Sequence, residues 1–273
     1  MSEHSSEHHI SIRVNTLKIT PALCRSKISE AFPDCSIDSV SWYENALVVR
    51  GIPRAVFLES PLVSDGLCYP QGLASMLPVL VLDPQPEELI LDMCAAPGSK
   101  TTQLAAHMRN TGEIVANDAS RTRLYKLATV AEMLGATNIT THIGKGEFLW
   151  RRYADTFDRV LVDAPCSMDQ PLSGKQIKAL ARQQTYLLRS ALACVKPGGR
   201  VVYSTCTHTR EENEAVIEYV IAKMPEAIIE PIGVSSMPQE WSTSEGYVRV
   251  QKNTEIESFF IACMVRGVEE KEV

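Results

Sequence analysis

The sequence predicts an α/β protein in which a doubly wound, mostly parallel sheet follows a small α+β domain. After residue 86, short apolar segments alternate with amphipathic helical segments, which is typical of repeated βα units. The residues before them follow a strand, helix, strand, strand order instead. A chain of 273 residues is long enough for one large core and a small additional unit.

The N-terminal part is expected to comprise three segments. Residues 1–9 lack the basic start and apolar run of a secretory signal, so we expect a flexible leader on a cytoplasmic protein, with a histidine metal site as the alternative. Residues 10–60 form the small α+β domain. Its expected elements are strands at 10–14, 37–42 and 46–50 and a helix at 21–31. Repeated prolines then predict a connector over residues 61–85.

The second domain, residues 86–268, contains the βα units. Its expected strands are 89–93, 113–117, 139–143, 159–163 and 200–204, with a strand-like segment at 258–265. A helix is expected at 121–134, and Thr209-Arg-Glu-Glu212 resembles a capping box that begins another. Ligands of parallel sheets bind at the carboxyl ends of the strands, so we expect the chemistry in the loops that follow them.

Composition excludes several classes of protein. A net charge of −6 argues against indiscriminate coating of nucleic acid, although it leaves room for a local basic groove. No apolar segment approaches the ~20 residues of a membrane span. The eight cysteines include no Cys-x-x-Cys pair, so neither a zinc site nor a disulfide framework is expected, and buried packing is the ordinary role of each.

The first loop of the second domain, Asp92-Met-Cys-Ala-Ala-Pro-Gly-Ser-Lys-Thr101, joins an apolar strand to a helix through small residues. Such a turn lets the backbone approach a ligand and directs helix N–H groups at it. It matches neither a P-loop nor a Gly-x-Gly-x-x-Gly motif. At the end of the next strand, Asp118 can accept both hydroxyls of a ribose, or it can cap the following helix.

Two cysteines follow two strand ends. Asp163-Ala-Pro-Cys-Ser167 ends the fourth strand, and Ser204-Thr-Cys-Thr207 ends the fifth. If the first strand lies beside the fourth, and the fifth next to that, these loops converge on the cofactor. Cys166 and Cys206 are then candidate nucleophiles.

Together these motifs resemble the RNA cytosine-C5 methyltransferase family of two-cysteine, S-adenosylmethionine-dependent enzymes. The resemblance runs from Tyr69 to the end of the chain and includes Ser75-Met76, with a weaker match at Arg13-Val-Asn-Thr-Leu17. It implies a Rossmann-like methyltransferase sheet and a small RNA-binding-like domain.

The resemblance also implies roles for individual residues. The Cys206 thiolate attacks cytosine C6, which makes C5 able to accept a methyl group. Asp163 hydrogen-bonds the pyrimidine edge, which requires a protonated or strongly coupled carboxyl. Cys166 assists product release, and Lys100 supports the site electrostatically. The implied cofactor contacts are Cys94, Ala95, Ala96, Pro97, Gly98, Ser99, Lys100, Asp118, Arg123 and Asp163.

The chain departs from the family pattern after the third strand, where Gly144-Lys-Gly146 replaces the usual Gly-Asp-Gly that holds the adenine amino group. After Ser167, the run from Met168 to Lys175 replaces the usual glycines and basic pair. These differences bear on cofactor affinity and substrate fit, respectively.

We expect a monomer that methylates a structured RNA, with tRNA preferred and rRNA second, and that binds neither metal nor membrane. Phosphate contacts would come from the N-terminal unit and from Arg121, Arg123, Lys126, Arg151, Arg152, Lys175, Lys178 and Arg182. One alternative makes Cys166 the nucleophile, as in DNA cytosine-C5 methyltransferases. Another is a catalytically inactive RNA-binding or assembly factor that keeps the fold.

Overall fold

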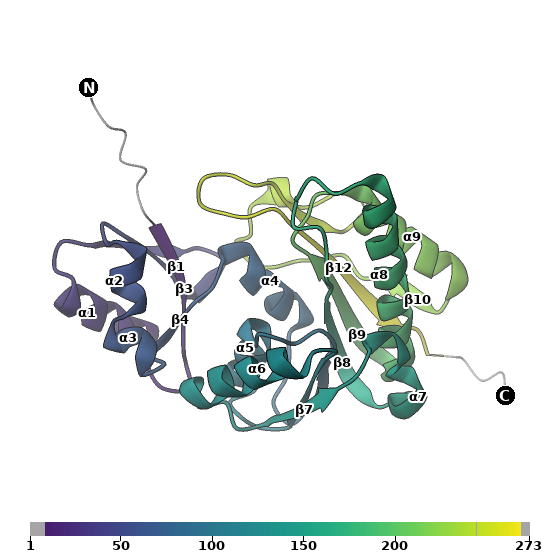
Figure 1. Ribbon diagram of the computed structural model, residues 1–273, viewed down its shortest axis with the longest axis horizontal. Helices are drawn as coiled ribbons and strands as arrows, with labels where there is room; N and C mark the ends of the chain where they lie inside the picture. Colours follow the sequence, from purple (N-terminus) through teal and green to yellow (C-terminus); the bar gives the residue numbers. More distant parts are fainter. Residues whose placement is uncertain (1–8, 244, 269–273) are drawn as a thin grey trace.

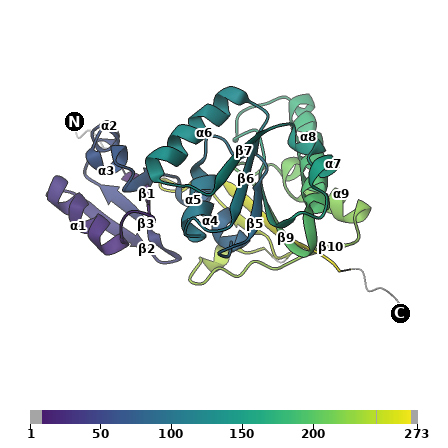
Figure 2. The ribbon, with the colours of Figure 1, turned by 90° about the horizontal axis from the view of Figure 1, so that it is seen from below.

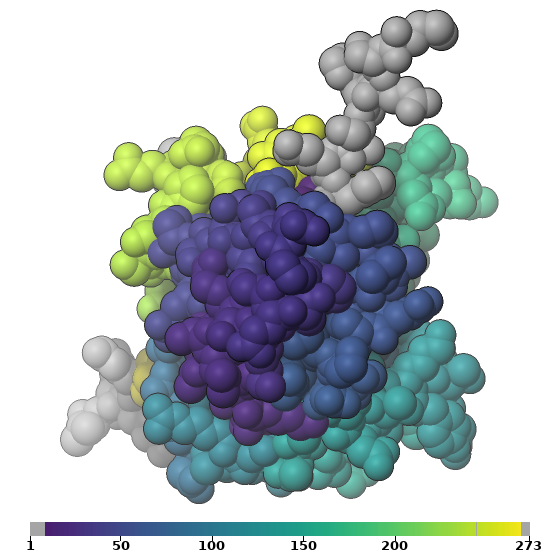
Figure 3. All heavy atoms as spheres, turned by 90° about the vertical axis from the view of Figure 1, so that its left-hand side faces the viewer, coloured from purple at the N-terminus to yellow at the C-terminus, as the bar shows by residue number. Residues whose placement is uncertain are grey.

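The structure is a computed structural model that describes residues 9–243 and 245–268. It contains a four-stranded antiparallel sheet near the N-terminus and an eight-stranded sheet in the rest of the chain. Figure 1 shows the smaller sheet and its helices at one end of the molecule, and Figure 3 shows this end face-on. Apart from His9, which begins the first strand, the expected leader lies outside the described residues.

The small sheet has the order β2-β3-β1-β4. Its strands are β1 His9–Val14, β2 Ser36–Val40, β3 Tyr43–Arg50 and β4 Cys68–Pro70. Helix α1, Pro21–Ala31, begins where Pro21 fixes the first turn and the Thr20 hydroxyl accepts from the Leu23 N–H. The predicted strands and helix are confirmed, except that the second strand ends at Val40 and not at residue 42, and the third begins at Tyr43 and not at residue 46.

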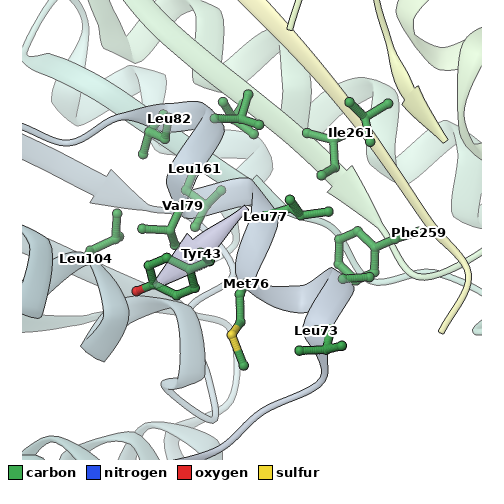
Figure 4. Packing of buried hydrophobic residues seen from close by; sticks show 14 of the residues in the cluster. Tyr43, Leu73, Met76, Leu77, Val79, Leu82, Leu104, Leu161, Phe259 and Ile261 are labelled. Carbon is green, nitrogen blue, oxygen red and sulfur yellow. The ribbon is translucent and has the colours of Figure 1, made fainter. Parts of the chain in front are cut away.

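The stretch expected to be a connector is more structured than its lack of periodicity suggested. It contains α2 Arg54–Leu58, α3 Pro61–Ser64, strand β4 and α4 Leu73–Leu82. β4 pairs with β1, whereas α4 packs on the large sheet. Figure 4 shows side chains of α4 packed among Leu161 and Ile261 of the large sheet and Leu104 of α5, with Tyr43 of the small sheet nearby.

The large sheet has the order β10-β12-β9-β8-β5-β6-β7, with β11 paired to β12. Its strands are β5 Leu89–Asp92, β6 Glu113–Asp118, β7 Ile139–Ile143, β8 Phe157–Asp163, β9 Val195–Thr205, β10 Ala227–Ile229, β11 Val248–Val250 and β12 Phe259–Arg266. Strands β7, β6, β5, β8 and β9 run parallel, and β12 is antiparallel to its neighbours. The doubly wound, mostly parallel sheet is therefore confirmed.

Helices cover both faces of this sheet, as Figure 2 shows. Successive strand residues point to opposite faces, so that Ile90 packs with α4 and α5, whereas Leu91 packs with α8. The helices are α5 Ser99–His107, α6 Arg121–Leu134, α7 Trp150–Tyr153, α8 Gly174–Cys194 and α9 Glu214–Lys223. Short 3₁₀ turns lie at η1 Gly146–Phe148, η2 Arg210–Glu212 and η3 Gln239–Trp241.

The predicted capping box at Thr209 was wrong. Residues 210–212 form η2, α9 begins only at Glu214, and the Thr209 side chain makes no cap hydrogen bond. Glu212 instead turns inward and is fully buried. A complete capping box occurs at the start of α8, where Ser173 and Gln176 each bond to the other's backbone N–H.

Candidate active site

The strand order brings four loops to one edge of the large sheet. β6, β5, β8 and β9 are parallel neighbours, so their carboxyl ends point the same way. Asp118, Asp92 and Asp163 end the first three of these strands, and Cys206 directly follows the fourth. The expected placement of the first strand beside the fourth, with the fifth next to it, is confirmed.

The two predicted cysteines lie side by side at this edge. Their sulfur atoms are 3.2 Å apart, and both side chains are partly buried. This hydrogen bond lowers the pKa of Cys166 and raises the pKa of Cys206, because one thiol can donate to the other's thiolate, whereas two adjacent thiolates would repel each other. The pair therefore gives up one proton readily and holds the second one.

Lys100 and Asp163 form an ion pair beside the cysteines, with 2.7 Å between Lys100 Nζ and Asp163 Oδ2. Lys100 also donates to Ser75 Oγ at 2.8 Å, and the Ser204 hydroxyl donates to Asp163 Oδ1 at 2.8 Å. The Lys100 side chain is 7% exposed, while that of Asp163 is 31% exposed. The carboxylate is thus held by two donors and still reaches the solvent side of the loop.

The loop from Cys94 to Gly98 is largely buried, with only Pro97 exposed. Gly98 has φ +110°, a backbone conformation that favours glycine, and a Cβ there would make a tight contact of 3.1 Å with Leu127 Cγ. Gly98 precedes the first residue of α5, which leaves the N-terminal end of that helix at the site. Burial raises the pKa of Cys94 well above its ordinary value, which suits a neutral lining residue.

Asp118 does not cap α6, because the side chain of Ser120 does so by accepting from the Arg123 N–H. The Asp118 side chain is only 4% exposed, and it forms an ion pair with Arg123 at 3.1 Å. Its other oxygen accepts from the Ser120 N–H at 2.8 Å. The capping alternative for Asp118 was therefore wrong, and a buried carboxylate remains at the end of β6 with lone pairs available to hydroxyl donors.

In the turn Gly144-Lys145-Gly146, which departs from the family pattern, the Lys145 side chain is exposed. Around it, Asn117 Nδ2 donates to the Gly144 carbonyl at 3.1 Å, and His142 Nδ1 lies 2.9 Å from Asn117 Oδ1. The backbone of this turn is thus fixed by its neighbours, while no acidic side chain occupies the position where the family usually has one.

Two residues at the site escaped the sequence-based selection. Glu212 Oε2 accepts from the Ser167 N–H at 3.0 Å and from Gln184 Nε2 at 2.9 Å, which anchors the loop that carries Cys166. Arg13, from β1, is fully buried and donates to Thr102 Oγ1 on α5 at 2.9 Å. The Arg13-Val-Asn-Thr-Leu17 match was a signal for the second, whereas no local pattern pointed to the first.

Among the described residues, no cluster of His, Cys, Asp or Glu has an arrangement that could hold a metal ion. No helix within residues 9–243 and 245–268 is both long and apolar enough to span a bilayer.

Comparison with known proteins decides the family. A family model described as 16S rRNA methyltransferase RsmB/F matches residues 79–265, more than half of the chain. The chain belongs to this family. The resemblance to RNA cytosine-C5 methyltransferases is thereby confirmed, and the family is S-adenosylmethionine-dependent.

Two curated relatives of this RsmB/F family member differ in how much of their length it covers. A tRNA (cytosine(49)-C(5))-methyltransferase of Pyrococcus abyssi is 35% identical over 92% of this chain and 86% of its own length. Ribosomal RNA small subunit methyltransferase F of Klebsiella pneumoniae is 37% identical over 92% of this chain, which spans only 56% of that protein.

Solved structures agree on the fold of this RsmB/F family member. A methyltransferase homolog protein from Pyrococcus horikoshii matches with a TM-score of 0.83 and 30% identity over 94% of this chain and 86% of that one. NSun6 from the same organism, solved with SFG, matches with a TM-score of 0.83 and 23% identity over 96% of this chain and 92% of its own.

Proposed function

We propose that this chain transfers a methyl group from S-adenosylmethionine to C5 of a cytosine in a structured RNA, through a covalent bond between Cys206 and cytosine C6. The observation that carries this proposal is the pair of cysteine sulfurs 3.2 Å apart at the carboxyl ends of two neighbouring parallel strands. Few packing roles require two thiols at this edge, where α/β sheets bind their ligands.

The residues present fit the ribose and methionine parts of the cofactor. The buried Asp118 carboxylate has the acceptor capacity that a ribose diol needs, and the small residues before α5 leave backbone and helix N–H groups accessible. Cys94 to Lys100, Asp118, Arg123 and Asp163 would line this site. When bound, S-adenosylmethionine supplies an electrophilic methyl group. The adenine end fits less well, since exposed Lys145 replaces the usual acid there.

Cys206 acts as the nucleophile in this proposal. Its sulfur forms a bond to C6 while the C5=C6 electron pair moves onto C5, which can then accept a methyl group. The hydrogen bond with Cys166 raises the pKa of Cys206, but the charge on Lys100 acts in the opposite direction. Because the pair holds one proton, Cys206 attacks C6 as a thiolate when this proton lies on Cys166. Cys166 then loses the proton to solvent before it acts as a base.

Asp163 and Lys100 orient the cytosine. A carboxylate held by Lys100 and Ser204 can accept from the exocyclic amino group of cytosine and keep the base in one orientation. The ion pair with Lys100 is the coupling of the Asp163 carboxyl on which this proposed role depends. Lys100 additionally places a buried positive charge beside the electron-rich adduct.

Cys166 completes the reaction in this proposal. As a thiolate, it removes the hydrogen from C5 after methylation, the C5–H electron pair re-forms the C5=C6 bond, and the Cys206–C6 bond breaks to return the Cys206 thiolate. The distance of 3.2 Å between the sulfurs puts both groups within reach of adjacent carbons of one ring.

We propose tRNA as the preferred substrate and rRNA as the second. This chain covers 86% of the Pyrococcus abyssi tRNA methyltransferase but 56% of the bacterial rRNA methyltransferase F, so it shares more of the first protein's architecture. The N-terminal sheet contributes to RNA binding in this proposal.

The direct test is methyl transfer from labelled S-adenosylmethionine to a tRNA pool and to 16S rRNA or small ribosomal subunits, with the product cytosine mapped by bisulfite sequencing. We expect 5-methylcytosine at a defined tRNA position. Methylation of rRNA alone would reverse the substrate order, and binding of RNA without methylation of either would contradict the proposal.

An inactive RNA-binding or assembly factor is the second candidate, and Lys145 is the observation that favours it. A basic side chain at the adenine end removes an expected acceptor. Calorimetric titration with S-adenosylmethionine separates the two, because an enzyme binds the cofactor and a protein that only keeps the fold does not.

A further inference from the structure

Helix α8 has a stripe of basic and aromatic side chains that the active site does not use. Lys175, Lys178, Arg182, Tyr186 and Arg189 are all exposed and occupy positions 1, 4, 8, 12 and 15 of the stripe. At about 100° per residue they fall within an arc of roughly 80°. They therefore share one face of the helix, which we call the α8 stripe.

The α8 stripe begins at the catalytic loop. Ser173, which caps α8, is seven residues after Cys166, and Lys175 lies in the first turn of the helix. At about 1.5 Å per residue, the stripe then extends roughly 21 Å to Arg189. Figure 1 shows α8 extending toward α7, away from the loops at its start.

The far end of the stripe opens into a pocket of about 430 Å³ between α8 and the segment η1–α7. The pocket is lined by Glu147, Phe148, Trp150, Arg151, Tyr186, Arg189, Ser190, Ala193 and Met224. Phe148, Trp150 and Tyr186 are 51%, 45% and 43% exposed. Exposure of three large aromatic side chains around one hollow is unusual for a surface with no ligand.

The pocket is preformed rather than a gap between loose segments. The Trp150 N–H donates to Ser190 Oγ at 3.2 Å, and Gln183 Nε2 donates to Glu147 Oε1 at 2.9 Å, so the η1–α7 segment is tied to α8 at two residues. Glu147, the one acidic residue in the pocket lining, thus accepts a hydrogen bond from the side-chain amide of Gln183.

The arginines here are available for phosphate. Arg151 lies 5.0 Å from the Phe148 ring and 5.6 Å from the Trp150 ring, and Arg182 lies 5.7 Å from the Tyr186 ring. Within residues 9–243 and 245–268, no ion pair includes Arg151, Arg182 or Arg189. In a chain of net charge −6, unpaired arginines on one flank favour an anionic partner.

We propose that the α8 stripe and this pocket bind the substrate RNA beyond the target cytosine, with phosphates along the stripe and an unpaired base stacked in the aromatic pocket. This inference rests on the proposed function, because the RNA that reaches the stripe enters from the catalytic loop. Positive side chains that follow a backbone, combined with aromatic rings that stack bases, are the features of a single-stranded nucleic-acid site.

Two kinds of variant separate the phosphate-binding and base-stacking roles. Trp150→Ala removes a stacking ring and is expected to weaken RNA binding about 10-fold without changing its salt dependence. Arg182→Gln with Arg189→Gln removes two charges and is expected to flatten the slope of log K against log salt by about 0.7 for each phosphate that is no longer neutralised. Trp150→Phe keeps an aromatic ring and should restore most of the affinity.

Matched controls come from elsewhere on the surface. Tyr219→Ala removes an exposed aromatic side chain from α9 outside the pocket, and Arg109→Gln removes an exposed charge from the turn after α5. Neither control is expected to change RNA affinity. Binding is measured by fluorescence anisotropy of a labelled tRNA substrate at several salt concentrations, and methylation of the same RNA gives KM and kcat.

We expect the pocket and stripe variants to raise KM for RNA while kcat at saturating RNA stays near the wild-type value. A short stem that presents only the target cytosine should not distinguish them from wild type. Wild-type methylation with unchanged RNA affinity in every stripe and pocket variant would overturn this inference and leave the proposed function standing. Absence of methylation by the wild-type chain would overturn the proposed function itself.

Discussion

The proposed ribose-binding role of Asp118 can be separated from helix capping by Ser120 with a pair of substitutions. Its carboxylate is buried at the end of β6, whereas the neighbouring Ser120 caps α6. We expect Asp118→Ala to weaken S-adenosylmethionine binding by about 1–3 kcal/mol, because the ribose hydroxyls lose their acceptor. Calorimetric titration measures this directly.

Ser120→Ala is the control for Asp118. It removes the cap and should lower the free energy of unfolding by about 1 kcal/mol while leaving cofactor affinity unchanged. Equal cofactor affinity in Asp118→Ala and the wild type would contradict the ribose role.

The buried carboxyl of Asp92 is expected to make the free energy of unfolding depend on pH. Thr101 Oγ1 donates to its Oδ2 at 2.7 Å, whereas its Oδ1 is buried with no hydrogen-bond partner among the described residues. Burial raises the pKa of Asp92 from 3.8 to about 7. Between these pH values the folded chain holds a proton that the unfolded chain has released. The contribution of the neutral carboxyl to the free energy of unfolding is therefore fully present below about pH 4, and it is lost as the pH rises to about 7.

Asp92→Asn cannot ionise, so its free energy of unfolding relative to wild type should increase between pH 4 and pH 7. Urea unfolding of both proteins at several pH values checks this. Burial lowers the pKa of His107 to about 4, which gives the opposite dependence, but both proteins share it and the difference isolates Asp92. Parallel curves for the two proteins would show that Asp92 is ionised in the fold.

At the scale of elements, local patterns predicted most of the fold. Alternating and 3.6-residue periodicities located α1, α6 and the five parallel strands to within a few residues. The stretch after residue 60 was harder, because α4 is almost wholly apolar and contains Pro78, so it has no amphipathic period to detect. Its helical form depends on burial between the two sheets.

The contacts of Glu212 at the site could not be predicted from the local sequence. Its spacing from Thr209 suits a capping box, yet its carboxylate bonds to Ser167 and Gln184, which are distant in sequence. The motif loops predicted the cysteines and Asp163, because strand ends and small residues are visible locally. Contacts such as the Lys100 bond to Ser75 and the Glu212 anchor depend on tertiary packing that no short window contains.

We expect Glu212→Ala to lower the free energy of unfolding by about 1–3 kcal/mol, since the buried Ser167 N–H loses its acceptor. It should also reduce kcat, because Glu212 holds the loop that carries Cys166. The control is Glu211→Ala, which removes an exposed carboxylate one residue earlier. Urea unfolding and methylation rates are compared, and equal effects of both substitutions would refute the anchoring role.

At the scale of the whole molecule, Arg13 connects the small sheet to α5, a helix that covers the large sheet. It lies on β1, its Nε donates to Gln71 Oε1 at 2.9 Å, and its Nη2 donates to Thr102 Oγ1 on α5, also at 2.9 Å. Burial lowers the pKa of Arg13 to about 10, which shows that burying this charged guanidinium carries a desolvation cost. The small sheet is thereby fixed to the helix that follows the cofactor loop.

Arg13→Lys keeps a charge but loses the forked geometry, and we expect it to lower the free energy of unfolding by about 1–3 kcal/mol. Arg25→Lys is the control, because the side-chain hydrogen bonds of Arg25 to described residues stay within the small unit, at Ile37 and Ser39. Scanning calorimetry should show earlier unfolding of the small unit in Arg13→Lys alone. Indistinguishable transitions for the two variants would contradict a connecting role.

The central claim is that Cys206 attacks the base and Cys166 resolves the adduct. The most direct measurement is denaturing gel electrophoresis of each variant after incubation with RNA and S-adenosylmethionine. We predict a denaturant-resistant protein–RNA band in Cys166→Ala, no band in Cys206→Ala, and no band when both substitutions are combined. A band in Cys206→Ala but not in Cys166→Ala, or normal turnover by both single variants, would contradict this assignment.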